Sequence, residues 1–191
     1  MRITKEKKQE NYERIITIAS ELFRERGYDG VAVAELMERA GLTHGGFYNH
    51  FRSKEELIAA ATARGFGETA ERYAGYDALA AIEAYISREH RDARGHGCPA
   101  AALSCEAARL PDETRSAFAA GIENLLSTFE GDMTRDHGAG SRALTISLLA
   151  QAVGAIVLSR ACPDNSSLAD EILDACRADC RDAIGNHARK Q

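Results

Sequence analysis

Hydrophobic residues recur at intervals of three and four along most of the chain, which is the spacing of one face of an α-helix. The first such series is Tyr12, Ile15, Ile16, Ala19, Leu22 and Phe23. It predicts a helix from about Lys5 to Arg26 that ends at Gly27, because glycine readily adopts the left-handed conformation that follows a helix. Alternation of apolar and polar residues, which is typical of strands, is rare. The chain is therefore predicted to be all-α, with about nine helices.

Three elements are predicted after this first helix. Their approximate ranges are Val33 to Ala40, His44 to His50 and Ser53 to Tyr73. A tight turn at Gly41 separates the first two, and Thr43 is a candidate cap for the second. Ser53 with Glu56 three residues later matches the capping box, in which a serine and a glutamate satisfy free amide groups at a helix start. The long third element is expected to connect two halves of the chain.

The remaining two-thirds is predicted to hold five more helices. Their approximate ranges are 76–90, 99–110, 112–133, 141–160 and 167–184. The helix at 141–160 contains the longest apolar stretch, Ala143 to Leu158, which is more apolar than one packed side needs. This stretch is shorter than a bilayer span and contains Ser147 and Gln151, so a buried or interface helix is expected and a membrane partner is not.

Composition narrows the class of protein. A chain of 191 residues with 45% hydrophobic residues is long enough for one or two domains with cores of their own. Residues 1–60 hold ten basic and ten acidic residues, and the other 14 basic and 19 acidic residues follow, so nucleic-acid binding must rest on local charge. The N-terminus lacks the apolar core of a secretory signal, and the five cysteines have irregular spacing. A cytoplasmic protein with free thiols is expected.

Residues 27–61 carry the motif on which the functional interpretation depends. They read GYDGVAVAELMERAGLTHGGFYNHFRSKEELIAAA. Three short helices with a tight turn between the second and third are the anatomy of a helix-turn-helix. This segment resembles the N-terminal signature of the TetR/AcrR family of bacterial transcriptional regulators, over roughly residues 10 to 60; one departure is Ala32, where the family often has Ser or Thr. We expect a helix-turn-helix domain at 1–53 and an effector-binding and dimerisation domain at 54–191.

The residues themselves suit an approach to DNA. The pair Gly45 and Gly46 costs about 1 kcal/mol each in helix propensity, but it leaves the backbone bare where a helix meets the major groove. Phe47 and Phe51, four residues apart, are expected to pack inward against Leu22, Phe23 and Leu36, while Tyr48 and His50 point outward. The candidate DNA-binding residues are Thr43, His44, Gly45, Gly46, Tyr48, Asn49, His50 and Lys54.

The family resemblance assigns roles within this set. It implies that Tyr48 and Lys54 contact the phosphate backbone, and that Thr43, His44, Asn49 and His50 touch bases or phosphates. His44 or Thr43 is our choice for a base edge. The resemblance also implies a homodimer through the last two long helices, a palindromic DNA operator, a small-molecule effector, and most often repression. It implies neither an enzyme nor a cofactor.

A ligand cavity is expected in the C-terminal part. Its candidate lining residues are Tyr73, Tyr85, His90, Phe118, Ile122 and Phe129, each of which also suits a core position. Cys98 precedes Pro99 and so falls at a helix N-cap, where the positive end of the helix dipole is expected to lower its pKa. Cys98, with Cys105 two turns later, is therefore a candidate sensor of electrophiles or oxidants, and the alternative is that both are packing residues.

Three other interpretations remain open from the sequence. His90, His96, Cys98 and Cys105 contain the right atoms for a metal site, but their spacing matches no paired-ligand pattern. A cysteine-dependent enzyme would use Cys98 as nucleophile and His90 or His96 as base, without a visible orienting partner. A structural dimer that does not bind DNA is the third.

Overall fold

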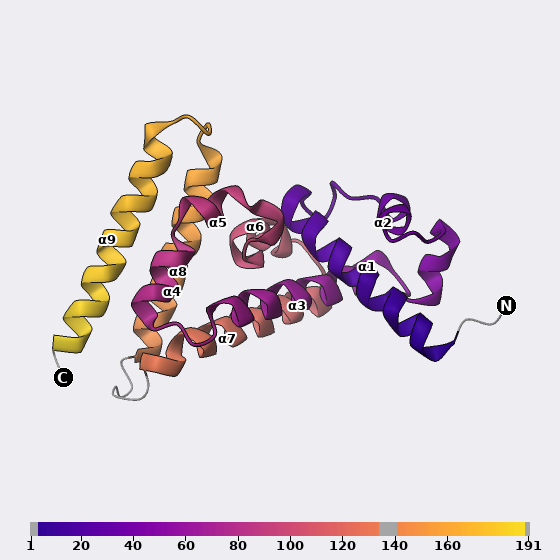
Figure 1. The fold of residues 1–191 in the computed structure, drawn as a ribbon, viewed down its shortest axis with the longest axis horizontal. Helices are drawn as coiled ribbons and strands as arrows, with labels where there is room; N and C mark the ends of the chain where they lie inside the picture. The colour runs from indigo at the N-terminus through magenta and orange to yellow at the C-terminus, as the bar shows by residue number, and fades with distance from the viewer. Residues whose placement is uncertain (1–3, 134–140, 190–191) are drawn as a thin grey trace.

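The computed structural model describes residues 4–133 and 141–189, and in these the regular structure is entirely helical. The elements are α1 (Lys5–Arg26), α2 (Val33–Arg39), the 3-10 helix η1 (His44–Asn49), α3 (Lys54–Tyr73), α4 (Ala78–Tyr85), α5 (Arg88–Asp92), the 3-10 turn η2 (Arg94–His96), α6 (Pro99–Ala107), α7 (Asp112–Met133), α8 (Ser141–Ala161) and α9 (Ser167–Arg189) (Figure 1). The predicted all-α class is confirmed.

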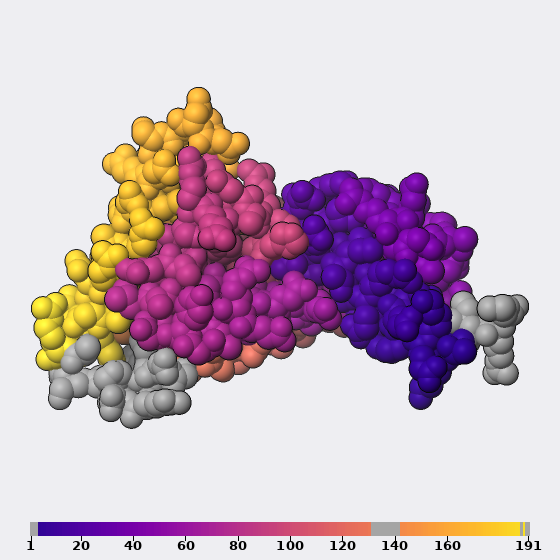
Figure 2. Space-filling view, in the orientation of Figure 1, coloured from indigo at the N-terminus to yellow at the C-terminus, as the bar shows by residue number. Residues whose placement is uncertain are grey.

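The helices form two parts joined by a long connector (Figure 1). α1, α2 and η1 make a unit at one end of the molecule, and α8 with α9 lies at the other end. α3 begins in the first unit and packs along α7 in the second, as predicted for the connecting helix. In the space-filling view the N-terminal third is a lobe at one end of the body (Figure 2). This arrangement leaves η1 far from α8 and α9.

The local signals that set helix ends were read correctly in several places. α1 runs from Lys5 to Arg26 as predicted, and Gly27 follows with a φ of +78°. Gly41 in the turn after α2 has a φ of +67°. Ser53 caps α3 by accepting a hydrogen bond from the Glu56 amide at 3.3 Å, while the Glu56 carboxylate accepts from the Arg52 amide at 2.6 Å. The capping box thus takes the amide one residue earlier than the standard pattern.

Other predicted elements differ from the structure. The helix expected over 76–90 is two helices, because the chain leaves helical geometry at Ile86 and Ser87 caps a new helix by accepting from the His90 amide at 3.1 Å. The helix expected over 99–110 ends at Ala107. The last helix extends to Arg189, beyond the expected end at Ile184.

The apolar helix α8 is longer than its apolar stretch suggested. Over Arg142–Ala161 it is long and apolar enough to cross a bilayer by length and composition, and 39% of its most apolar window is buried against the rest of the chain. The prediction that it is too short was therefore wrong, because the helix continues beyond the apolar residues at both ends. Its buried side packs mainly on α9 and α7.

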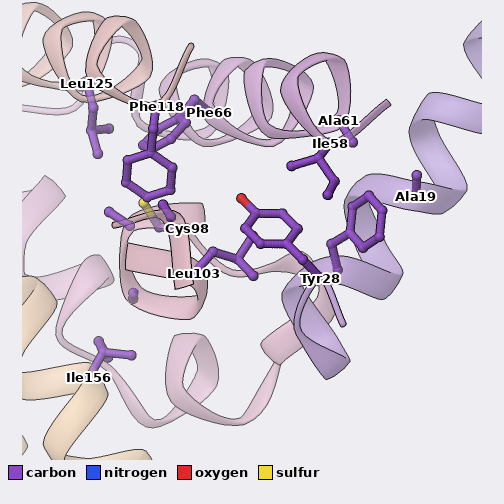
Figure 3. Close-up of a cluster of buried hydrophobic side chains, with 14 of the residues drawn as sticks. Ala19, Tyr28, Ile58, Ala61, Phe66, Cys98, Leu103, Phe118, Leu125 and Ile156 are labelled. Atoms are coloured by element: carbon purple, nitrogen blue, oxygen red, sulfur yellow. The ribbon is translucent and has the colours of Figure 1, made fainter. Parts of the chain in front are cut away.

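Tyr28, directly after α1, ties the two parts together (Figure 3). Its ring lies between Ile58 of α3 and Leu103 of α6, and its hydroxyl pairs with Thr62 of α3 at 2.9 Å. Its backbone amide donates to the Glu106 carboxylate of α6 at 2.7 Å. The N-terminal unit is therefore hydrogen-bonded to both α3 and α6.

A second connection links α1 with the start of α6. The buried Arg24 guanidinium donates to the Gly97 carbonyl at 3.1 Å and pairs with Glu68 of α3 at 2.8 Å. Sequence analysis identified only the apolar stripe of α1, so Arg24 and its partners were not foreseen. Any movement of the segment just before α6 would act on α1 through this side chain.

Candidate nucleic-acid interface

The element η1 projects most of its side chains into solvent. Thr43, His44, Gly45 and Asn49 are exposed, and Tyr48 exposes 69% of its surface although it is a large aromatic residue. This exposure agrees with the expected outward direction of Tyr48. The exposed tyrosine together with the exposed polar side chains beside it makes η1 a candidate contact surface.

η1 is anchored by Phe47 within it and by Phe51, which follows two residues after its end. Phe47 and Phe51 expose 1% and 2% of their surface, as predicted, with ring centroids 5.5 Å apart. Phe51 also stacks on Tyr12 of α1 at 5.0 Å, a contact that joins η1 to the first helix. These rings hold η1 in one orientation while its other face stays open.

The backbone of η1 differs from the predicted α-helix. It is a six-residue 3-10 helix, in which each amide bonds to the carbonyl three residues earlier. Thr43 takes the N-cap position without a side-chain hydrogen bond, so the predicted capping role is wrong; the Gly46 amide donates instead to the Thr43 carbonyl at 2.9 Å. Two adjacent poor helix formers, Gly45 and Gly46, account for a short and tight element here.

Packing within the chain does not account for the two glycines of η1. A Cβ added at Gly45 meets nothing within 4 Å, and one added at Gly46 meets only ordinary contacts at 3.5 Å and 3.6 Å. The fold therefore does not require glycine at position 45. This observation favours a close approach from outside the chain as the reason for a bare backbone.

His50 is less exposed than predicted. It is half-buried beside Phe51, and its Nδ1 is buried without a hydrogen-bond partner in the part of the chain that the structure describes. Burial lowers the pKa of His50, and the nearby Lys8 ammonium lowers it further. The imidazole is thus favoured in its neutral form, which makes His50 a weaker phosphate ligand than an exposed cation.

Basic groups flank η1 at the start of α3. Lys54, a predicted phosphate ligand, donates from Nζ to the Tyr28 carbonyl at 2.6 Å, so one of its three N–H groups is used within the fold. Arg52 is exposed and pairs with Glu56 at 3.1 Å. Sequence analysis missed Arg52, although a basic residue directly before the Ser53 cap was a readable signal.

The C-terminal part contains a cavity of about 490 Å³ between α3, α4 and α5. Its lining residues are Arg72, Tyr73, Tyr76, Ala84, Ser87, Glu89, His90, Ala93 and His96. The volume falls within the ordinary range for small-molecule sites, about 300–1,000 Å³. Of the six residues proposed from the sequence, Tyr73 and His90 line it.

The other four proposed cavity residues lie elsewhere. Tyr85 is fully buried with its ring centroid 4.5 Å from that of His90, and Phe129 packs on Tyr73 at 5.6 Å, so both form the floor beneath the cavity. Phe118 and Ile122 face a separate hollow between α6 and α7. A periodic apolar stripe does not distinguish these positions. Arg72, Tyr76, Glu89 and His96 were missed.

His90 is held rigidly by both ring nitrogens. Nδ1 lies 2.8 Å from the Tyr85 carbonyl and therefore carries the proton, and Nε2 accepts from the Cys98 amide at 2.9 Å. Burial lowers the pKa of His90 to about 4; the hydrogen bond to Tyr85 opposes this shift, and the charges of Arg160 and Arg72 add to it. With both nitrogens occupied, His90 is not available as a base for Cys98.

A neutral, buried histidine predicts how stability depends on pH. The unfolded chain takes up a proton near pH 6.5 and the folded chain only near pH 4, so protonation favours unfolding. His90 alone should lower the unfolding free energy by about 3 kcal/mol between pH 7 and pH 4. Denaturant titrations of wild type and His90→Gln across this range should show a steeper loss in wild type. Parallel profiles would contradict the assignment.

The Cys98 thiol is not the activated thiolate that its position suggested. Cys98 is the N-cap residue before Pro99, as predicted, but it is fully buried and burial raises its pKa. The predicted lowering of the pKa is therefore wrong, because loss of solvent outweighs the helix dipole. Cys105 is exposed, so the two cysteines do not share an environment. All five cysteines are free thiols, as expected.

The described residues also do not support the interpretation of His90, His96, Cys98 and Cys105 as metal ligands. In residues 4–133 and 141–189 no group of three or more His, Cys, Asp or Glu side chains could hold a metal ion. Of the four residues considered from the sequence, His90 has both nitrogens bonded and Cys98 is buried, while the exposed His96 lies 3.7 Å from Glu21.

Comparisons with known proteins agree with the helix-turn-helix geometry. Residues 15–61 match the model of bacterial regulatory proteins, tetR family. TetC of transposon Tn10 from Escherichia coli is 38% identical over 60 residues, and the regulator TtgR of Pseudomonas putida is 42% identical over 60 residues. These matches cover 29% and 31% of this chain and only 30% and 29% of the two relatives, so this chain resembles them over less than a third of their length.

Weaker similarity extends over most of the chain. The repressor DhaR of Mycobacterium sp. is 26% identical over 144 residues, covering 71% of this chain and 73% of DhaR. The reduced form of E. coli NemR shares the fold, with a TM-score of 0.75, 22% identity and coverage of 91% and 96%. AibR, solved with isovaleryl coenzyme A and operator DNA, has a TM-score of 0.56 at 21% identity, covering 87% and 96%. Residues 15–61 therefore form a domain of the tetR family of bacterial regulatory proteins, and the chain as a whole shares the fold of solved regulators of that family.

Proposed function

We propose that the protein is a homodimeric, DNA-binding transcriptional regulator, most simply a repressor released from a palindromic operator by a small molecule. The observation that carries the proposal is η1: an element anchored by Phe47 and Phe51 that exposes Tyr48 and a bare backbone at Gly45. AibR, which has the same fold, was solved with operator DNA and a coenzyme A ester. In this account residues 1–53 bind DNA and residues 54–191 bind effector and partner.

The contacts with DNA are divided between positioning and reading. Tyr48 and Lys54 are proposed to hold phosphates, because one is a hydroxyl on an exposed ring and the other an ammonium fixed by Tyr28. His44 or Thr43, whose side chains are exposed, is proposed to reach a base edge, and the exposed Asn49 to touch a base or a phosphate. The His50 side chain is half-buried. It is therefore proposed to support η1, and only the edge of its ring would touch DNA.

Gly45→Ala tests the interface without disturbing the fold. The added methyl group enters open space, so we expect the unfolding free energy to hold or to rise by up to about 1 kcal/mol. Operator affinity, measured by fluorescence anisotropy, should fall by about tenfold or more, because the methyl group blocks close approach of the backbone. Gly67→Ala, at an equally open glycine of α3, is the matched control and should keep full affinity.

Dimerisation is proposed through the uncovered face of α8, together with α9. Leu158 and Leu168 expose 58% and 51% of their surface, and Ile146 and Val157 are also exposed. Between them lie Ala150 and Gly154, and a Cβ at Gly154 would meet nothing within this chain. A helix face of large apolar residues around small ones suits close packing of helices.

The same face is proposed to meet protein rather than lipid. Arg142 at one end of α8 pairs with Glu123 at 2.7 Å, and Gln151 in the middle binds Asp179 of α9 at 2.8 Å. These polar contacts suit a helix that lies against other helices in water. A cytoplasmic dimer accounts for the uncovered surface without a membrane.

The effector is proposed to release the protein from DNA by shifting an equilibrium between two conformational states. The cavity lies against the C-terminal end of α3, whose first residues adjoin η1, so α3 transmits its position to the DNA surface. The structure adds two further contacts to this route: Glu106 of α6 with the Tyr28 amide, and Arg24 with the Gly97 carbonyl. Movement of α6 would thereby reach α1 as well.

A further inference from the structure

The cavity between α3, α4 and α5 has both aromatic and charged residues in its lining. The hollow beside α8 is lined mainly by alanine, leucine, isoleucine and valine. The larger cavity instead combines Tyr73 and Tyr76 with Arg72, Glu89 and His96. It therefore offers both an aromatic surface and charged groups to a ligand.

Several polar groups around this cavity are already used within the fold. His90 is bonded at both ring nitrogens. The Ser87 hydroxyl donates to the Ala84 carbonyl at 2.8 Å and accepts from the His90 amide. Neither side chain is free to recognise a ligand, so recognition falls to the remaining groups.

Arg72 is the main free cation of the cavity. It is exposed and forms no ion pair with any carboxylate in residues 4–133 and 141–189. Its nearest interaction is with Tyr73, where burial raises the phenol pKa to about 12 and Arg72 partly offsets the rise. Tyr73 thus stays a neutral phenol beside a guanidinium whose hydrogen bond to Tyr73 leaves its other N–H groups for a ligand.

A second guanidinium, that of Arg160, contacts the cavity residue His90. Arg160 donates hydrogen bonds to the backbone carbonyl oxygens of His90 at 2.7 Å and of Arg91 at 2.9 Å. The charges of both Arg160 and Arg72 lower the pKa of His90. Among the residues that the structure describes, Glu89 is the only acidic one in the cavity lining, and its carboxylate opposes the positive charges of Arg72 and Arg160 from the side of α5.

The aromatic residues define the rest of the ligand. Tyr73 and Tyr76 meet edge to face at 6.1 Å, and Tyr76 exposes 46% of its surface although it borders the cavity. Ala84 and Ala93 add apolar walls. A flat apolar body against Tyr76 would cover surface that the chain leaves open, whereas Tyr73 exposes only 3% of its surface.

We propose that this cavity binds an amphipathic anion, with an aromatic or other flat apolar body against Tyr73 and Tyr76 and a carboxylate or comparable anionic group on Arg72. The inference rests on the proposed function only in treating the ligand as an effector; the charge preference itself is a property of the cavity. A bidentate pair with Arg72 supplies specificity, because charge-assisted hydrogen bonds are about twice as strong as neutral ones.

The test uses two fluorescent probes with the same aromatic skeleton. 1-Anilinonaphthalene-8-sulfonate is an anion, and N-phenyl-1-naphthylamine lacks the sulfonate. We expect the anion to bind wild type more tightly, and Arg72→Gln to weaken the anion by about ten- to hundredfold while leaving the neutral probe within about twofold. Glu89→Gln should act in the opposite direction and strengthen the anion, and Arg72→Lys should retain part of the preference.

Arg115→Gln is the matched control, because Arg115 borders the separate hollow between α6 and α7. It should change neither probe. Equal binding of the two probes to wild type, or an Arg72→Gln protein that keeps the same preference, would overturn the inference. Neither result depends on DNA: a protein that failed to bind DNA would refute the proposed function and leave the charge preference standing.

Discussion

Replacing Gly154 with glutamate is expected to convert the proposed dimer to monomers while the fold of each chain is kept or strengthened. Gly154 lies mid-way along the uncovered face of α8, and an added side chain meets open space within the chain. Glutamate should raise helix stability by about 0.5–1 kcal/mol relative to glycine. In the dimer, the same side chain would keep the helices apart and bury a charge, which costs several kcal/mol.

Sedimentation velocity over a range of concentrations measures the effect. The dimer dissociation constant should rise by about a hundredfold or more, which corresponds to about 3 kcal/mol. Operator affinity should fall with it, because a monomer engages one half-site. Gly67→Glu makes the same chemical change at an open glycine of α3 and should remain dimeric. A dimeric Gly154→Glu protein would show that this face of α8 is not the interface.

Phe47→Ala is expected to have the largest effect on stability among substitutions in η1. Phe47 exposes 1% of its surface and contacts Phe51 and Tyr48 through their rings. Truncation of a buried phenylalanine costs about 3–5 kcal/mol, because apolar contacts are lost and a cavity remains. Since Tyr48 depends on this anchor, DNA binding should disappear as well.

The neighbouring Tyr48→Ala is the informative comparison. Tyr48 is largely exposed, so its loss should change the unfolding free energy by less than about 0.5 kcal/mol while DNA affinity falls for all sequences alike. Thermal unfolding and anisotropy titrations on both variants separate the two roles. If Tyr48→Ala unfolded as readily as Phe47→Ala, the assignment of Tyr48 to the contact surface would be wrong.

Local signals in the sequence were enough to predict the N-terminal unit. The stripe that ends at Phe23, the glycine at 27 and the Ser53 cap each act within one or two turns of helix, so they can be read without knowledge of distant contacts. The outward Tyr48 and inward Phe47 followed from the same periodicity. The 3-10 form of η1 was not predicted, because two glycines in succession weaken the α-helix without specifying its alternative.

Features that depend on distant contacts were not predictable in the same way. Cys98 was placed correctly at its N-cap, but its burial comes from residues far away in the sequence, and this burial reverses the expected direction of its pKa shift. Ile86 fits an apolar stripe, yet the chain turns there. The cavity residues Arg72 and Glu89 look like ordinary surface charges until α3 and α5 are brought together.

The most direct test of the central claim is selection from fragmented genomic DNA of the source organism. Purified wild-type protein and Tyr48→Ala would each be incubated with the fragments, and the bound DNA sequenced. We expect wild type to enrich fragments that share an inverted repeat, with half-site centres separated by about 10 base pairs or a multiple, and binding that weakens steeply with salt. Enrichment by wild type no greater than by Tyr48→Ala, or without a shared repeat, would contradict the account.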